Sequence, residues 1–302
     1  MQKTFILGVG SQKGGTTWLH RQLTSNATVD LGHKKEYHVF DSIELQEQTR
    51  KKKANLKHGW RDRCIDKVIK AHHQNQLGKN LSSKNQEHYR ALELAFIDNV
   101  DNYFDYFDYL YLKNHDVQIV GDITPSYALL QPKTFRLIKR GLEKRGFTIK
   151  VIFLMRDPVE RAWSMARMKK RNMPEASQHQ FNEFNFLQKS SPKKPGNRKS
   201  RYEETIVNIE KVFDQQNIYY DFYERLFSTE CRESIQEFLE LELGEFDASQ
   251  VVNASPKSNS IPEELNQKMV NQFHSTYEFI LSRHGIEIID LWQGYQYFSR
   301  QP

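Results

Sequence analysis

The sequence predicts an α/β fold in which a parallel sheet is flanked by helices and carries a largely helical insertion. Two short runs, residues 5–10 and 150–155, are almost wholly apolar, which is typical of strands buried on both faces of a parallel sheet. Each run is followed by a turn and then by apolar residues at helical spacing. Strand, turn and helix recurring in this order favour a parallel sheet with right-handed crossovers.

The other elements are predicted from weaker signals in chain order. A first helix is expected from Thr16, where apolar residues recur every three or four positions. The second strong run leads to Pro158, which suits the first turn of a helix over residues 159–171. Weaker strands are predicted at residues 118–120 and 218–222, and helices at residues 133–144, 202–215, 234–241 and 263–284.

Two stretches do not follow this alternation. Residues 42–115 are rich in Lys, Gln, Asn and His with scattered aromatic residues, and we interpret them as a helical insertion or cap. Residues 172–201 carry Pro, Gly and positive charge without periodicity, so we expect a loop there. We therefore predict a single domain over residues 1–302, with the insertion inside it.

Composition and charge narrow the class of protein. Of the 302 residues, 38% are hydrophobic and 27% charged, which indicates a folded protein with wide polar loops. An excess of 44 Lys and Arg over 38 Asp and Glu favours anionic partners such as nucleotides. Cys64 and Cys231 are the only cysteines, and their spacing predicts neither a disulfide framework nor a metal site. No apolar run approaches the about 20 residues of a membrane span, and no secretion signal is recognised, so we expect a cytoplasmic protein.

A glycine-rich turn joins the first strand to the first helix. From Gly10 to Thr17 the chain reads Gly-Ser-Gln-Lys-Gly-Gly-Thr-Thr, in which glycines let backbone N–H groups converge on an anion. The helix that begins at Thr16 points its positive end at the same place. The turn therefore predicts a phosphate-binding loop and a P-loop-type parallel sheet, with an ordinary tight turn as the alternative.

This loop differs from the loops of ATP- and GTP-binding proteins. Those place a lysine directly after the last glycine, whereas Gly15 is followed here by Thr16, and Lys13 comes earlier. A P-loop kinase using Mg-ATP is therefore the less favoured alternative. A lysine in front of two threonines resembles instead the 5′-phosphosulfate loop of sulfotransferases, which use 3′-phosphoadenosine 5′-phosphosulfate (PAPS) as the donor. The resemblance implies that the donor is bound by Lys13, Gly14, Gly15, Thr16, Thr17 and Trp18.

A second motif follows the second strong run. Residues 156–164 read Arg-Asp-Pro-Val-Glu-Arg-Ala-Trp-Ser, which is similar to the segment with which sulfotransferases bind the 3′-phosphate of PAPS. A guanidinium at the end of a strand can grip a phosphate with two N–H groups, and a hydroxyl on the next helix adds a third donor. The resemblance assigns these roles to Arg156 and Ser164. The alternative is an ordinary helix start in which the arginines of the segment pair with its carboxylates. A later segment resembles the loop that closes on the nucleotide, which adds Ser255 and Lys257 as donor contacts.

A third segment resembles one branch of the same family. Residues 34–40, Lys-Lys-Glu-Tyr-His-Val-Phe, are similar to the Lys-Glu-x-His-Phe-Phe segment of the heparan (glycosaminoglycan-type) sulfotransferases, with Val39 in place of a phenylalanine. The resemblance implies that Glu36 is the base that takes the proton of the acceptor, with Lys35 and His38 lining the site. His38 is the alternative base, and a solvated carboxylate paired with a lysine is the ordinary interpretation of Glu36.

The segment after the strand predicted at residues 118–120 resembles the acceptor cleft of that branch. It reads Gly-Asp-Ile-Thr-Pro-Ser-Tyr, with Asp122 and Ile123 where the branch has a Glu-Lys pair, so the lysine that would contact an acidic sugar is missing. Asp122 either binds the acceptor or holds Lys35, and the turn after the strand is the structural alternative. The resemblance implies that the acceptor is contacted by Lys35, Asp122, Thr124, Ser126 and Tyr127.

These resemblances together imply an enzyme that moves the sulfuryl group of PAPS to a hydroxyl or amine by in-line transfer. Glu36 would take the acceptor's proton and Lys13 would stabilise the leaving phosphate of the product, 3′-phosphoadenosine 5′-phosphate (PAP), without a metal. The acceptor, a small molecule, saccharide or lipid, is left open because the insertion is expected to select it. A noncatalytic anion or nucleic-acid binder is the remaining alternative, but the sequence contains no recognised nucleic-acid-binding module.

Overall fold

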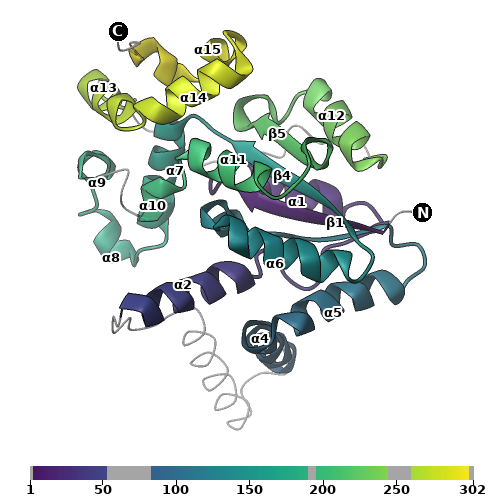
Figure 1. The fold of residues 1–302 in the computed structure, drawn as a ribbon. Helices are drawn as coiled ribbons and strands as arrows, with labels where there is room; N and C mark the ends of the chain where they lie inside the picture. The colour runs from purple at the N-terminus through teal and green to yellow at the C-terminus, as the bar shows by residue number, and fades with distance from the viewer. Residues whose placement is uncertain (1–2, 53–82, 190–194, 244–259, 299–302) are drawn as a thin grey trace.

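A five-stranded parallel sheet forms the centre of the protein (Figure 1). The computed structural model describes residues 3–52, 83–189, 195–243 and 260–298. The sheet has the order β2-β3-β1-β4-β5. Its strands are β1 (Thr4–Gly10), β2 (Val29–Asp30), β3 (Ile119–Ile123), β4 (Thr148–Met155) and β5 (Ile218–Phe222). The predicted α/β architecture is confirmed, and the carboxyl ends of the strands meet at one edge of the sheet.

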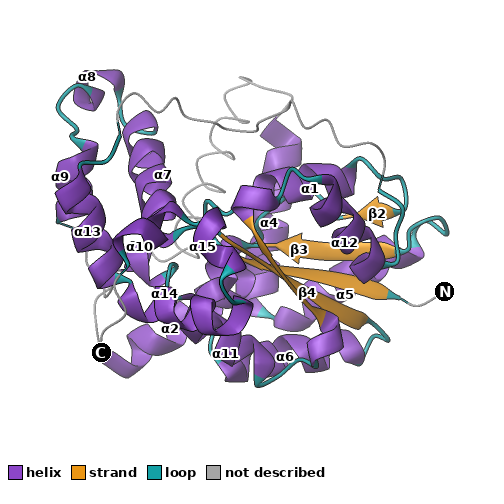
Figure 2. Ribbon diagram, turned by 90° about the horizontal axis from the view of Figure 1, so that it is seen from above, coloured by secondary structure: helices purple, strands orange, loops and turns teal. Residues whose placement is uncertain are grey.

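The two central strands are buried on both faces, which explains their uninterrupted apolar sequence. Phe5 of β1 packs into the larger apolar cluster, whereas its neighbour Ile6 packs into a second cluster on the opposite face. Val151 and Ile152 of β4 divide in the same way. Figure 2 shows α1 (Thr16–Thr24) and α12 (Thr229–Leu239) on one side of the sheet, and α6 (Pro132–Glu143) and α11 (Tyr202–Glu210) on the other.

The predicted insertion is helical wherever the structure describes it. Its helices are α2 (Val39–Lys52), α4 (Ser83–Asp98) and α5 (Val100–Leu112), and residues 53–82 lie outside the described residues. Tyr103 and Phe107 of α5 are fully buried, and the ring of Phe107 lies 5.0 Å from that of Phe5 in β1. Part of the insertion therefore belongs to the main core rather than to a separate cap.

The loop predicted for residues 172–201 is interrupted by short helices, so the prediction is wrong in those places. After α7 (Pro158–Arg171), the chain forms the short helices α8 (Glu175–Gln178), α9 (Glu183–Gln188) and α10 (Pro195–Arg198). Leu187 of α9 is fully buried, and Trp163 of α7 donates to the Glu183 carboxylate at 3.0 Å. These helices are stabilised by contacts with a distant segment, which local periodicity does not reveal.

Three further boundaries differ from the prediction. The expected helix over residues 263–284 is interrupted at Phe273, so that α13 (Glu263–Gln272) and α14 (His274–His284) are separate, and α15 (Glu287–Leu291) follows. The helix α12 begins before residue 234, because the Ser228 hydroxyl accepts from the Cys231 N–H as an N-cap. The two-residue strand β2 was not predicted, because so short a segment has no periodicity of its own.

Candidate active site

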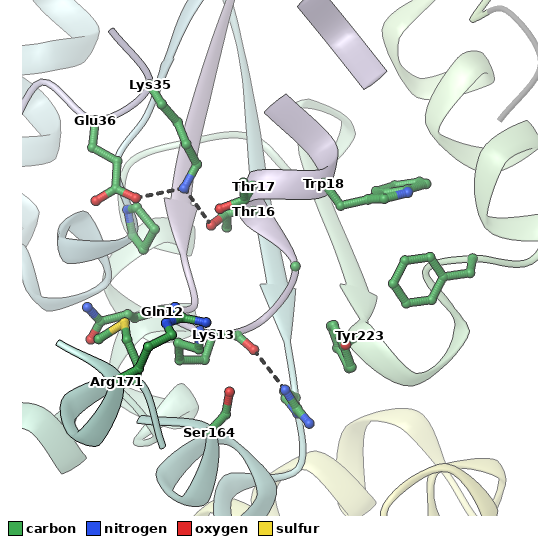
Figure 3. Close-up of a pocket in the computed structure, with 15 residues that line it drawn as sticks. Gln12, Lys13, Thr16, Thr17, Trp18, Lys35, Glu36, Ser164, Arg171 and Tyr223 are labelled. Carbon is green, nitrogen blue, oxygen red and sulfur yellow. Dashed lines mark hydrogen bonds and ion pairs between the residues drawn. The ribbon is translucent and has the colours of Figure 1, made fainter. Parts of the chain in front are cut away.

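One pocket of about 250 Å³ opens at the edge of the sheet where β1 and β4 end. Segments far apart in the sequence line it: the glycine-rich turn, the segment before α2, the start of α7 and the residues after β5 (Figure 3). The structure therefore brings both phosphate-binding motifs and the base segment to one cavity. The predicted residues in its lining are Lys13, Gly15, Thr16, Thr17, Trp18, Lys35, Glu36, Arg156 and Ser164.

The glycine-rich turn has a backbone geometry that requires glycine at Gly15. This residue directly precedes α1 with a φ of 93°, and a Cβ on it would lie 2.3 Å from Leu226 Cδ2. The first N–H groups of a helix have no intrahelical acceptor, so those of Thr16 and Thr17 are available to an anion in the pocket. The N–H of Gly14 instead donates to the Ser11 carbonyl at 2.9 Å, so the Gly14 N–H is already satisfied within the turn.

Lys13 lies in the turn among other cations. It has a left-handed backbone with a φ of 73°, and its side chain lines the pocket. Burial, together with the positive charges of Arg171 and Arg156, lowers the pKa of Lys13 from 10.5 to about 8. An anion in the pocket would be attracted by this surplus of positive charge and would in turn favour the charged form of the lysine.

Arg156 is held at the end of β4 by contacts on several sides. Its Nη2 lies 3.2 Å from Glu160 Oε2, its Nη1 donates to the Lys13 carbonyl at 3.4 Å, and its guanidinium lies 4.2 Å from the centre of the Tyr223 ring. Its Nε is buried and has no hydrogen-bond partner among the residues that the structure describes. Ser164, two turns along α7, faces the same cavity.

The other charged residues of the second motif stabilise the fold. Asp157 is the N-cap of α7 and accepts from the N–H groups of Val159 at 2.8 Å and Glu160 at 3.1 Å. Arg161 is fully buried and donates to the hydroxyl of Ser200. The alternative of an ordinary helix start is thus correct for the Arg156–Glu160 pair, but Arg161 pairs with neither carboxylate of the segment in the contacts described.

The base segment forms a chain of charged contacts beside the turn. Lys35 Nζ lies 2.7 Å from Glu36 Oε1 and donates to the Thr16 hydroxyl at 3.4 Å. His38 Nε2 lies 3.4 Å from Glu36 Oε2, and its Nδ1 lies 2.9 Å from Asp41 Oδ2. In Figure 3 the Glu36 and Lys35 side chains approach the pocket from the same side.

These contacts set the protonation of the two candidate bases. Burial by itself would raise the pKa of Glu36, but hydrogen bonds and charges from His38 and Lys35 lower it to about 2. Burial would lower the pKa of His38, but Asp41 and Glu36 raise it to about 9. At neutral pH the glutamate is therefore ionised and the histidine carries a proton.

The residues predicted to contact the acceptor include Asp122, Thr124 and Tyr127, none of which is among the residues that line the pocket, so their contact with an acceptor stays a prediction. All three side chains are fully buried. Asp122 accepts from the hydroxyls of Thr124 at 2.6 Å and Tyr127 at 2.8 Å, and none of its described contacts is with Lys35. Ser126 accepts from Lys199 at 3.0 Å instead of lining the pocket. The predicted donor contacts Ser255 and Lys257 lie outside the described residues.

Several lining residues were not predicted from the sequence. Met168 and Arg171 follow Ser164 at helical spacing on α7, a pattern that could have been found once that helix was assigned. Tyr223 and Phe227 come after β5, and their rings lie 5.7 Å apart. Nothing in the sequence relates them to Trp18, whose ring lies 5.5 Å from that of Phe227.

Lys199 is a further cation next to this site. Its Nζ donates to Gln12 in the glycine-rich turn at 3.3 Å and to Ser126 at 3.0 Å. Burial and the charge of Arg161 lower the pKa of Lys199 below that of an ordinary lysine. Because it comes from the stretch expected to be a loop, its place beside the turn could not be read from the sequence.

Comparison with known proteins identifies the family. A sequence profile described as the sulfotransferase domain matches residues 3–280. The chain belongs to the sulfotransferase family. A search of curated protein sequences finds no match, so the assignment rests on the profile. The assignment to the glycosaminoglycan branch stays a prediction.

A solved sulfotransferase structure shares the fold. The chain is similar to a sulfotransferase from Alicyclobacillus acidocaldarius, with 16% identity, a TM-score of 0.56, and coverage of 94% of this chain and 96% of that one. It is also similar to the sulfotransferase domain of the olefin synthase from Synechococcus PCC 7002, with 15% identity, a TM-score of 0.49 and 94% coverage of both chains. At these identities the likeness concerns the fold alone.

No group of three or more His, Cys, Asp or Glu side chains among the described residues is arranged to hold a metal ion. No helix in the described part of this sulfotransferase is long and apolar enough to cross a membrane.

Proposed function

We propose that this sulfotransferase uses PAPS as its donor and transfers the sulfuryl group to a hydroxyl or amine in the 250 Å³ pocket. The observation that carries the proposal is the convergence of Lys13, Arg156, Ser164 and Glu36 on one cavity from three distant segments. The alternative of a kinase gains no support from any of these positions, because the residue after Gly15 is a threonine.

The pocket offers donors for both phosphate groups of PAPS. The N–H groups at the start of α1 would bind the 5′-phosphosulfate, and the guanidinium of Arg156 with the hydroxyl of Ser164 would bind the 3′-phosphate. The buried Nε of Arg156 supports this fit, because a buried donor without a partner costs free energy until a ligand accepts from it. Trp18 and Tyr223 offer aromatic surface for the adenine.

The protonation states favour Glu36 over His38 as the base. A histidine with a pKa raised to about 9 already holds its proton at neutral pH and cannot take another. Glu36, with a pKa lowered to about 2, is ionised at neutral pH, so its carboxylate has a free site for the proton of the acceptor, although so low a pKa makes it a weak base. In this assignment His38 and Lys35 hold the carboxylate in place.

The transfer then needs one bond to form as another breaks. The acceptor atom attacks sulfur, the bond between sulfur and the bridging oxygen of the 5′-phosphate breaks, and the proton of the acceptor passes to Glu36. Negative charge develops on the leaving phosphate, where Lys13 and the N–H groups of the turn would stabilise it. PAP and a sulfated acceptor are the products. The acceptor class, whether a small molecule, saccharide or lipid, is left open by this assignment.

Isothermal titration with PAP in the absence of metal, and in parallel with Mg-ATP, tests the proposal. We expect PAP to bind with micromolar affinity and Mg-ATP to bind far more weakly, because the loop has no lysine placed for a γ-phosphate. Tighter binding of Mg-ATP would replace the sulfotransferase mechanism with phosphoryl transfer. Binding of neither nucleotide would contradict the assignment of the pocket.

A further inference from the structure

The segment that carries Glu36 has no regular structure of its own. Residues 36–38 belong to neither a helix nor a strand, and α2 begins only at Val39. His38 has a φ of 57°, a left-handed conformation that residues other than glycine seldom adopt. Contacts outside the segment must therefore hold it in this conformation.

Two hydroxyl groups accept from the backbone on either side of His38. The N–H of Tyr37 donates to Thr124 Oγ1 at 2.9 Å, and the N–H of Val39 donates to the hydroxyl of Tyr127 at 3.3 Å. As the first residue of α2, Val39 has no intrahelical acceptor for its N–H. The two bonds thus fix the peptide group between Glu36 and Tyr37 and the one between His38 and Val39.

Both hydroxyls are themselves oriented by one buried carboxylate. Asp122, at the end of β3, is fully buried, and it accepts from Thr124 at 2.6 Å and from Tyr127 at 2.8 Å. A third hydroxyl, that of Tyr103 in α5, donates to the same carboxylate at 3.0 Å but has no described bond to the base segment. An ionised carboxylate can only accept hydrogen bonds, so each hydroxyl must point its hydrogen at Asp122. Its lone pairs are then left to accept from a backbone N–H group.

We propose that Asp122 is a positioning residue that acts through the hydroxyls of Thr124 and Tyr127 to fix the backbone around His38 and thereby aim Glu36 at the acceptor. This inference rests on the proposed role of Glu36. It explains why the structure buries a carboxylate directly behind the site, where the sequence suggested a contact with substrate.

Two tyrosines make a matched pair for the test. Tyr127 and Tyr103 are both fully buried, and both donate to Asp122 Oδ2. Tyr127→Phe removes a hydroxyl that also accepts from Val39, whereas Tyr103→Phe removes one that has no described bond to the base segment. Both variants lose one bond to the same carboxylate, so a difference between them reports the lost Val39 acceptor rather than general weakening of the core.

The readouts are measured by NMR on the protein without donor or acceptor. In Tyr127→Phe we expect the Val39 amide to exchange with solvent about tenfold faster, because its acceptor is gone. We also expect the pKa of His38 to fall from about 9 toward the ordinary histidine value, because the ring moves relative to Glu36 and Asp41. Asp122 also interacts with the charge of His38, and both variants retain this carboxylate. Tyr103→Phe should leave both readouts unchanged.

Thr124→Val provides a second, independent variant if Tyr127→Phe does not fold. It should accelerate exchange of the Tyr37 amide about tenfold and lower the His38 pKa in the same direction. Equal changes in Tyr103→Phe, or no change in the other two variants, would overturn the proposal. Because these measurements need neither PAPS nor an acceptor, they can fail while the proposed activity stands, and the activity can fail while they succeed.

Discussion

The affinity for PAP depends most directly on Arg156, which we expect to bind the 3′-phosphate. Replacing it by methionine keeps a long side chain against the Tyr223 ring but removes every N–H donor, including the buried Nε. The change also removes the ion pair between Arg156 Nη2 and Glu160 Oε2, which lie 3.2 Å apart. Arg156→Met therefore changes the surroundings of the Glu160 carboxylate as well as the contacts available to the ligand.

The magnitude follows from the hydrogen bonds that are lost. A hydrogen bond to a charged group contributes about 1.5 to 3 kcal/mol net. Since about 1.4 kcal/mol corresponds to a tenfold change in Kd, Arg156→Met should weaken PAP binding about 10- to 150-fold. The double variant Arg156→Met/Glu160→Gln should recover part of this loss, because it also removes the negative charge with which Arg156 pairs.

The assay is isothermal titration with two ligands. Adenosine 5′-monophosphate lacks the 3′-phosphate, so its Kd should change by less than about threefold in Arg156→Met. The difference between the two ligands isolates the contact between Arg156 and the 3′-phosphate, and a thermal melt confirms that the variant is folded. Equal losses for both ligands would show that Arg156 acts only through the fold. Unchanged PAP affinity would place the 3′-phosphate elsewhere, and either result would refute the reasoning.

Three other predictions follow from the structure. Lys13→Met should lower turnover about 100- to 1,000-fold, because removal of one preorganised donor typically has this effect. Turnover is measured as transfer of sulfate from labelled PAPS, and a near-normal value would contradict the role of Lys13 at the leaving phosphate. The kcat/KM for PAPS should fall as the pH rises through about 8, because this ratio reports the free enzyme, in which the pKa of Lys13 is lowered to about 8 and its charge is lost above that pH. Measurements of kcat/KM across pH would reveal this limb, which should be absent in Lys13→Met. Tyr277→Phe removes the hydrogen bond of 3.0 Å from the Tyr277 hydroxyl to Asp157, the N-cap of α7. The free energy of unfolding, measured by urea titration, should fall by about 1 kcal/mol. The Kd for PAP should be unchanged and is the control.

The sequence contained enough local information to predict the sheet and to place the two motifs proposed to bind phosphate at the ends of its central strands. The runs ending in Gly10 and Met155 are apolar because their strands are covered on both faces, and this requirement is visible without any partner. The motifs were recognised for a similar reason. Each motif is a continuous segment at one strand–helix junction. The glycines of a tight turn and the residues typical of a helix start can therefore be recognised without knowing which distant segments pack nearby.

Tertiary structure decided what the sequence could not. The short helices between residues 172 and 201 exist because side chains such as Leu187 are buried by distant segments. Lys199 and Tyr223 reach the site only because α10 and β5 are packed beside the glycine-rich turn. Asp122 is the sharpest case: its sequence context suggested a contact with the acceptor, whereas the structure buries it among hydroxyl groups, and we propose from this that it supports the base segment. Local sequence determines which residues can do chemistry, whereas burial and the meeting of distant segments determine which of them reach the pocket.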